Sequence, residues 1–292
     1  MPLIEANGID INYILGETHV QTGDLLVLVN GLADDLTTWN HQVPAFLAAG
    51  YDVLRYDNRG IGKSSKPPGP YTSEMMAEDL YGLLLALKIT DAFHLLGVSM
   101  GGMIAQSYAL KYPNGSPAAK GLQMRSLSLC CTYAQPTPFC ERMFTLWADM
   151  ARRMSVQDVM RDVTLWAFTV PFFRTRTEEL EQVEEAMRRL DMSLDAYLAQ
   201  LNVIQTFDST GPLGGLKAEG RGLGGLEGGE VLVLAGKVDI LIPVMLSREL
   251  AEQIDESRFL TTKGGHGCMW EFPDGFSKTI IGFLSEHRGR KQ

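Results

Sequence analysis

The chain has 292 residues, a length that fits one large α/β domain or two small ones. Hydrophobic residues make up 45% of the chain and charged residues 21%, as in globular proteins with a full core. The formal net charge of −9, with no basic stripe to offset it, argues against a nucleic-acid partner.

Short apolar runs alternate with helical patterns along most of the chain, and this alternation predicts a mostly parallel central sheet flanked by helices. Residues 9–15 alternate between apolar and polar side chains, which predicts an early hairpin strand. Continuous apolar runs are typical of strands that helices cover on both faces. We expect such strands at residues 25–29, 53–56, 95–98, 127–131 and 231–234, with a weaker one at 258–262, and helices at 74–87, 103–112, 245–254 and 274–287.

The strand expected at 95–98 runs into a Gly-x-Ser-x-Gly turn at residues 97–101, and an amphipathic helix follows. That context is typical of a nucleophile elbow, a sharp and strained turn that lifts the serine side chain off the end of the strand. The N–H groups at the start of the helix lie where negative charge develops during attack on a carbonyl. Ser99 is therefore the candidate nucleophile.

Residues 133–210 interrupt the alternation, because they contain no good strand and show helix starts at Thr137, Ser155 and Thr177. We interpret this segment as a helical cap inserted into an α/β core made of residues 1–132 and 230–292. Its large apolar side chains either line a pocket below the cap or only pack the cap onto the core. The pocket candidates are Trp147, Trp166 and Phe168, together with Met269 from the core.

Residues 211–229 contain nine glycines. Glycine at that density gains little from burial and keeps a high backbone entropy, so this stretch is predicted to be a flexible connector from the cap back to the sheet. A phosphate-binding loop is not expected here, because no strand-to-helix turn accompanies the glycines.

A serine nucleophile needs a base, and the base needs an acid that holds its tautomer. Of the five histidines, only His266 lies just after a strand candidate, in a glycine-rich loop before a helix. The acid is expected in a loop between Ser99 and His266, where Asp239 directly follows a buried strand. Asp208 and Asp255 are weaker rivals, and a plain turn residue is the structural alternative for Asp239.

Two backbone N–H groups are expected to hold the oxyanion that forms on the substrate. One belongs to Met100, directly after the nucleophile, and the other to Leu32, in the Asn-Gly-Leu loop after the strand at 25–29. Residues 57–64 end like a P-loop, but Asp57 stands where glycine is needed. No cluster of residues shows metal-ligand spacing, so neither a metal nor a cofactor is expected.

Together these motifs resemble those of the α/β-hydrolase superfamily, whose catalytic residues follow the order serine, acid, histidine. The resemblance covers nearly the whole chain and is to the cap-bearing group that holds 3-oxoadipate enol-lactonases, small carboxylesterases, carbon–carbon hydrolases and cofactor-free haloperoxidases. It implies an α/β-hydrolase fold with a helical cap, Ser99, Asp239 and His266 as a catalytic triad, and Leu32 and Met100 as the oxyanion hole. Asn-Gly at residues 30–31 departs from the usual His-Gly of that group.

The resulting hypothesis is hydrolysis of a small, largely apolar ester or lactone through an acyl-serine intermediate. Acyl transfer or carbon–carbon bond hydrolysis by the same triad, and small-molecule sensing without turnover, are the alternatives. The expected partner is a small-molecule substrate, without nucleic acid or membrane, and the choice between monomer and homodimer is open. The sequence shows no signal peptide and no membrane-spanning run, and its four cysteines show no disulfide pattern, so a cytoplasmic protein with reduced thiols is expected.

Overall fold

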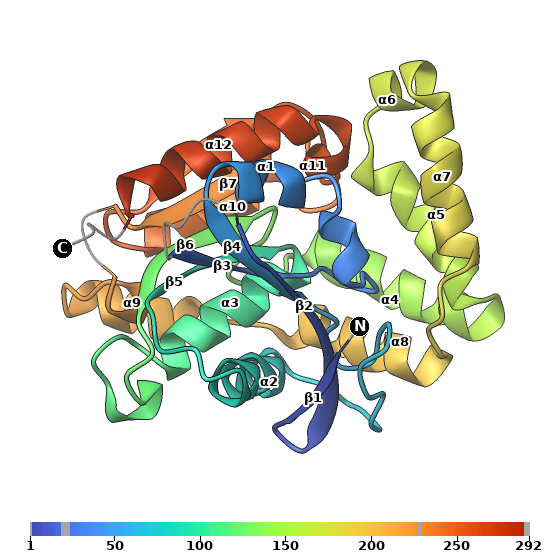
Figure 1. Ribbon diagram of the computed structural model, residues 1–292. Helices are drawn as coiled ribbons and strands as arrows, with labels where there is room; N and C mark the ends of the chain where they lie inside the picture. Colours follow the sequence, from blue (N-terminus) through green and yellow to red (C-terminus); the bar gives the residue numbers. More distant parts are fainter. Residues whose placement is uncertain (1, 19–23, 227–228, 289–292) are drawn as a thin grey trace.

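A mostly parallel sheet with helices on both faces forms the centre of the computed structural model (Figure 1). The structure describes residues 2–18, 24–226 and 229–288. Its strands are β1 (Leu3–Ala6), β2 (Ile9–Gly16), β3 (Asp24–Val29), β4 (Tyr51–Tyr56), β5 (Phe93–Val98), β6 (Met124–Cys130), β7 (Val231–Gly236) and β8 (Arg258–Thr262). They lie in the order β1-β2-β4-β3-β5-β6-β7-β8, with β2 antiparallel to both of its neighbours and all other pairs parallel. The predicted α/β architecture is confirmed.

The strand β1 was not among the predicted elements, although the sequence carries a signal for it. Asn7 and Gly8 have φ angles of 51° and 74° and form the two-residue turn between β1 and β2. Asn-Gly is the preferred pair for such a turn, because both positions need positive φ. The predicted hairpin strand at 9–15 therefore finds its partner in Leu3–Ala6.

Helices connect the strands and fill the segment between β6 and β7 (Figure 1). None of the helices within the described residues has the length and hydropathy needed to cross a membrane. The helices are α1 (Val43–Ala48), α2 (Ser73–Ala86), α3 (Met100–Lys111), α4 (Pro138–Arg153), α5 (Val156–Ala167), α6 (Val170–Thr175), α7 (Thr177–Arg188), α8 (Leu194–Thr206), α9 (Thr210–Ala218), α10 (Val244–Gln253), α11 (Cys268–Glu271) and α12 (Pro273–Glu286), with short 3₁₀ turns at Leu36–Trp39, Pro117–Ala119 and Leu223–Gly225.

The two faces of the sheet bury separate apolar clusters, as the strand period of two requires. On β3, Leu25, Val27 and Val29 point into the cluster that α2, α3 and α10 complete. Leu26 and Leu28 point to the opposite face, where side chains from α1 and α12 cover them. Every residue of β3 is buried, so its sequence reads as a continuous apolar run.

The segment expected to form a cap folds into α4 to α8, which lie together beside the carboxyl ends of the parallel strands (Figure 1). Thr137 and Ser155 cap α4 and α5 by accepting hydrogen bonds from the N–H groups of Cys140 and Asp158. Two further helices, α6 and α8, were not predicted. Both begin with the same signal, since the side chains of Thr169 and Ser193 cap their first turns.

The flexible connector expected at 211–229 is only partly what the structure shows. Residues 210–218 form α9, and Leu223–Gly225 forms a 3₁₀ turn, while residues 227 and 228 lie outside the described residues. Burial of Leu213 outweighs the entropic cost of glycine in a helix. Gly224 serves close packing, because an added Cβ would lie 2.7 Å from Cε of Met124.

Candidate active site

Ser99 occupies a strained turn between β5 and α3, with φ of 55° and ψ of −120°. Such a conformation is costly for a residue with a side chain and is found mainly at functional sites. The glycines around it are required by sterics. A Cβ on Gly97 would lie 2.2 Å from the carbonyl oxygen of Gly101, and a Cβ on Gly101 would lie 2.2 Å from that of Val29. The turn at Ser99 therefore combines a strained backbone with close packing that only glycine allows at residues 97 and 101.

His266 and Asp239 form a buried hydrogen-bonded pair. Nδ1 of His266 lies 2.9 Å from Oδ2 of Asp239. The other carboxylate oxygen of Asp239 accepts hydrogen bonds from the backbone N–H groups of Leu241 and Ile242, at 3.0 and 2.9 Å. These bonds hold the carboxylate in one orientation, and that carboxylate in turn orients the imidazole ring.

The loop that carries His266 is tied to the cap segment by two contacts that the sequence analysis did not identify. The N–H of Gly267 donates to the carbonyl of Ala167 at 2.8 Å. Glu271 is buried, and its carboxylate accepts from the N–H of Gly265 at 2.7 Å and from the hydroxyl of Thr169 at 2.5 Å. A glutamate five residues after the candidate base gives no motif signal, because its partner Thr169 lies about a hundred residues away in the chain.

Leu32 lines the same cavity as Ser99, and Met100 directly follows Ser99 at the start of α3. Among the residues that the structure describes, none accepts a hydrogen bond from the N–H of Leu32. Met100 begins α3, and the first N–H groups of a helix have no carbonyl partner within it. The N–H of Ala33, by contrast, already has an acceptor, because it donates to Oε1 of Gln200 at 3.0 Å. The N–H of Leu32 is therefore available as a donor.

The fold and this geometry agree with the comparison to known families. The family model of the alpha/beta hydrolase fold matches residues 24–273. The chain belongs to the α/β-hydrolase family.

Relatives and solved structures cover nearly the full length of this α/β-hydrolase. A protein of Azorhizobium caulinodans named "Putative carbamate hydrolase RutD" is 26% identical over 98% of this chain and 99% of its own. The enol-lactonase from Burkholderia xenovorans LB400 is 27% identical, with a TM-score of 0.80 over 97% of this chain and 100% of that one. A thermophilic esterase from Thermogutta terrifontis is 25% identical, with a TM-score of 0.80 over 99% and 100% of the two chains.

Asn30 holds the loop after β3, residues 30–35, which we term the oxyanion-side loop. Its Oδ1 accepts from Nε1 of Trp39 at 2.7 Å, and its Nδ2 donates to the carbonyl of Tyr56 at 2.7 Å. Asn58 donates to the carbonyl of Asn30 at 3.2 Å. The asparagine side chain thus anchors the loop through both its amide oxygen and its amide nitrogen.

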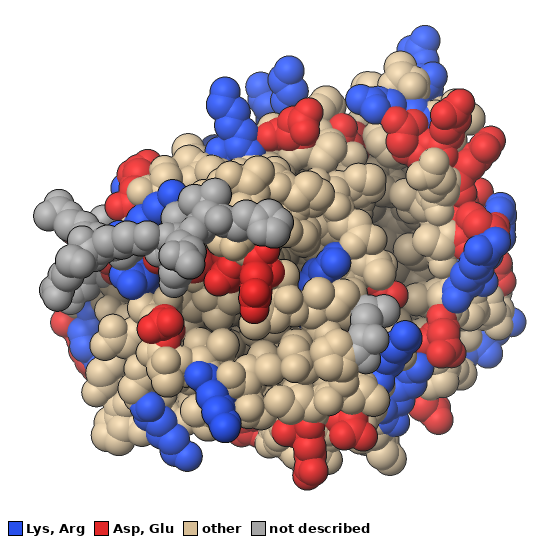
Figure 2. Space-filling model, in the orientation of Figure 1, with Lys and Arg blue, Asp and Glu red and all other residues tan. Residues whose placement is uncertain are grey.

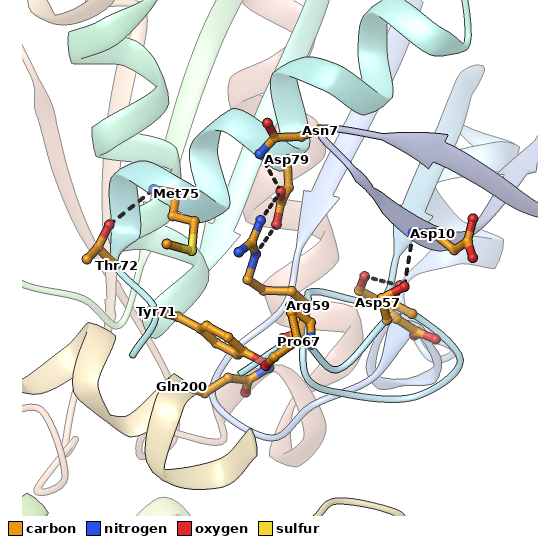
Figure 3. A network of polar contacts seen from close by, with 12 residues as sticks. Asn7, Asp10, Asp57, Arg59, Pro67, Tyr71, Thr72, Met75, Asp79 and Gln200 are labelled. Atoms are coloured by element: carbon orange, nitrogen blue, oxygen red, sulfur yellow. Dashed lines mark hydrogen bonds and ion pairs between the residues drawn. The ribbon is translucent and has the colours of Figure 1, made fainter. Parts of the chain in front are cut away.

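Gln200 on α8 connects the same loop to the segment that resembles a P-loop (Figure 3). Its Nε2 donates to the carbonyl of Arg59 at 2.7 Å, while the guanidinium of Arg59 makes two hydrogen bonds of 2.5 Å to Asp79. Asp57 accepts hydrogen bonds from Asn12 and from the N–H of Lys63, at 2.7 and 2.9 Å. Residues 57–64 therefore form an internally bonded structural loop, as the resemblance implies.

A cavity of about 1250 Å³ opens beside Ser99 and His266, between the core and the cap segment. Figure 2 shows the hollow, with mostly uncharged surface around it. An apolar cavity with a few polar groups at one end is the usual form of a small-molecule site. The apolar side chains that line it include Phe144, Trp147, Met160, Phe168, Phe172 and Trp270.

Two of the four predicted pocket residues line the cavity, namely Trp147 and Phe168, and two do not. Trp166 lies on another face of α5, where its ring contacts Phe139 and its Nε1 donates to Asp162 at 3.3 Å. Met269 is turned away from the cavity and is buried in the cluster below α12. Residue type alone predicted these two side chains wrongly, because helix rotation decides which face meets the cavity.

Three possible metal ligands meet near the candidate base. Ligand atoms of Cys131, Asp239 and His266 lie within 4.8 Å of one another. The Cys131 thiol is buried 3.7 Å from the thiol of Cys268, and this contact together with burial raises its pKa well above the ordinary value. Metal binding needs a thiolate and a free imidazole nitrogen. A thiol that stays protonated is a poor metal ligand, so Cys131 does not fit a metal ion at this cluster.

Asp34 adds an acid to the cavity that the sequence analysis did not single out. Its side chain lines the cavity together with Ser99 and His266. Burial and the neighbouring charge of Asp35 raise the pKa of Asp34 to about 7, and the proximity of His266 lowers it only in part. Asp34 is thus a weaker acid than an ordinary aspartate, as groups at functional sites often are.

Proposed function

We propose that this protein is a serine hydrolase that cleaves a small, largely apolar ester or lactone through an acyl-serine intermediate. The observation that carries the proposal is that Ser99, on its strained elbow, opens onto the same apolar cavity as His266, which Asp239 orients at 2.9 Å. A named esterase and a named enol-lactonase among the similar structures support esters and lactones as the substrate class.

The proposed mechanism follows from the hydrogen bonds. When Nδ1 of His266 donates to Asp239, Nε2 is left as the acceptor that takes the proton of Ser99. The oxygen of Ser99 then attacks the carbonyl, and the N–H groups of Leu32 and Met100 stabilise the oxyanion. Removal of one such donor costs about 3–4 kcal/mol of transition-state stabilisation in a well-studied protease.

Collapse of the tetrahedral intermediate releases the alcohol, which His266 protonates. His266 then activates a water molecule, and its attack on the acyl-serine releases the carboxylic acid and restores the enzyme. Every step uses only groups of this chain, the ester or lactone, and one water molecule. The apolar lining of the cavity favours an uncharged acyl or alcohol part, because burying apolar surface is favourable.

The first test is covalent labelling. The protein and its Ser99→Ala variant are treated with a fluorophosphonate and their intact masses recorded. We expect one adduct on the wild type and none on the variant, followed by turnover in a screen of esters, lactones and, because of the relative named for them, carbamates. An intact fold without an adduct on either protein would overturn the proposal and favour small-molecule sensing. Product analysis with added alcohols or amines separates hydrolysis from acyl transfer.

A further inference from the structure

Asp34 places a carboxylate next to the candidate nucleophile. A Cβ added to Gly31 would lie 3.0 Å from Oδ2 of Asp34 and 3.5 Å from Cβ of Ser99. The carboxylate and the nucleophilic residue therefore both border one point beside the oxyanion-side loop. A substrate carbonyl held at Ser99 would have its neighbouring atoms within reach of Asp34.

The loop is built to hold this position. Ala33 has a φ of 57°, a left-handed conformation that is unfavourable for alanine. The hydrogen bond from its N–H to the buried side chain of Gln200 stabilises that conformation. Asn30 adds a long hydrogen bond of 3.4 Å from its Nδ2 to the carbonyl of Asp34. The backbone before and after the Asp34 side chain is thus held by hydrogen bonds.

Asp34 differs from Asp35, Glu179 and Glu271, three other acids of the cavity, in its hydrogen bonds. Across the described part of the chain, no group donates a hydrogen bond to its carboxylate. Asp35, its neighbour, accepts from the N–H of Thr37 at 2.8 Å, and Glu271 accepts from two partners. Glu179, near the exposed rim, pairs with Arg176 at 2.7 Å.

A half-buried carboxylate without a donor costs free energy, and native proteins seldom keep such a group without a use for it. Here the unused acceptor faces a cavity that a substrate would fill, close to Ser99 and to apolar side chains such as Trp147 and Phe168. A donor or a positive charge on the substrate would satisfy it, whereas a second carboxylate would be repelled.

We propose that Asp34 is a substrate-selecting group, which favours esters or lactones carrying a hydrogen-bond donor or a cationic nitrogen beside the reacting carbonyl and rejects those carrying a carboxylate there. This inference rests on the proposed hydrolase function, because it places the selected group relative to the carbonyl that Ser99 attacks. It narrows the substrate class from apolar esters in general to those with one polar, non-anionic substituent.

The test uses four benzyl esters that differ only in the group beside the carbonyl. Propanoate is neutral without a donor, glycolate is a neutral donor, betaine is a cation without a donor, and the malonate half-ester is an anion. Release of benzyl alcohol at pH 8 is measured for the wild type, Asp34→Asn and Asp34→Leu. The matched control is Asp35→Asn, which removes the same charge one residue away while an amide oxygen can still cap the turn.

In the wild type, kcat/KM is expected to be highest for the glycolate or betaine ester and lowest for the malonate ester. In Asp34→Asn, the kcat/KM for the malonate ester relative to that for the propanoate ester should rise about tenfold. The kcat/KM for the betaine ester relative to that for the propanoate ester should fall about tenfold, as expected for one charged contact. Asp34→Leu should also lose the preference for glycolate. Equal ratios in wild type and Asp34 variants, or the same shifts in Asp35→Asn, would overturn the proposal.

A binding measurement separates this proposal from the proposed function. In the Ser99→Ala protein, which cannot turn the ester over, the betaine ester is expected to raise the Tm, and adding Asp34→Asn should abolish that rise. If the wild type hydrolyses none of the esters but this difference holds, the serine mechanism fails and the Asp34 site stands. If the esters are hydrolysed and neither the ratios nor the Tm respond to Asp34, the Asp34 proposal alone fails.

Discussion

Gln200 offers the most informative perturbation, because it links the cap segment to the oxyanion-side loop. Its side chain accepts from the N–H of Ala33 at 3.0 Å and donates to the carbonyl of Arg59 at 2.7 Å, in a fully buried place. Gln200→Leu leaves both backbone groups buried without a partner. At about 1–3 kcal/mol for each of the two groups, the free energy of unfolding should fall by about 2–6 kcal/mol.

The same change should reduce catalysis beyond its effect on stability. Without the bond to Gln200, Ala33 loses the support for its φ of 57°. The adjacent N–H of Leu32 should then move from the position in which we propose that it holds the oxyanion. Loss of one oxyanion donor lowers kcat by about 10²–10³-fold. We expect a fall of that size in kcat for a good ester substrate, with a much smaller change in KM.

Asn202→Leu is the matched control on the same helix. Asn202 donates to the carbonyl of Tyr71 at 2.9 Å, a bond of the same kind that does not reach the oxyanion-side loop. Its loss should lower the free energy of unfolding by about 1–2 kcal/mol with little effect on kcat. Gln200→Glu keeps an acceptor for Ala33 and should retain more activity than Gln200→Leu. If Gln200→Leu loses stability but keeps the wild-type kcat, as expected for Asn202→Leu, the coupling between the cap segment and the oxyanion-side loop is refuted.

Three further predictions follow from named contacts. Asp239→Asn should lower kcat by about 10⁴-fold, because the amide favours the wrong tautomer of His266, and a Tm near that of the wild type checks that the fold is kept. Gly101→Ala should prevent folding, since the new Cβ would lie 2.2 Å from the carbonyl of Val29; a soluble variant with wild-type circular dichroism and Tm would contradict this steric argument. The raised pKa of Asp34, about 7 against an ordinary 3.8, means that the folded protein holds a proton which the unfolded chain releases, so ionisation of Asp34 lowers stability as the pH rises from about 4 to 7. Asp34→Asn should therefore raise the Tm more at pH 8 than at pH 4, and an equal change at both values would show that neither Asp35 nor burial destabilises the charge.

The sequence by itself determined the local features of this protein. The strands appear where continuous apolar runs predict them, because a strand buried on both faces needs apolar side chains at every position. The turn at Ser99 is equally local, since the glycines around it are the only residues that the close contact of β5, α3 and β3 allows. Helix starts such as those at Thr137 and Ser155 are also local, because each N-capping side chain bonds an N–H only three residues further along the chain.

Only the tertiary structure decided the features that depend on segments far apart in the chain. Ala33 and Gln200 are separated by 167 residues, and no local pattern pairs them. The glycine-rich residues 210–218 form a helix because Leu213 is buried against the core, which local composition does not show. Trp147 faces the cavity and Trp166 does not, although both donate to Asp162. Short-range periodicity sets which elements form, whereas the rotation and packing of those elements set which side chains meet, and a substrate would contact the residues that packing brings together.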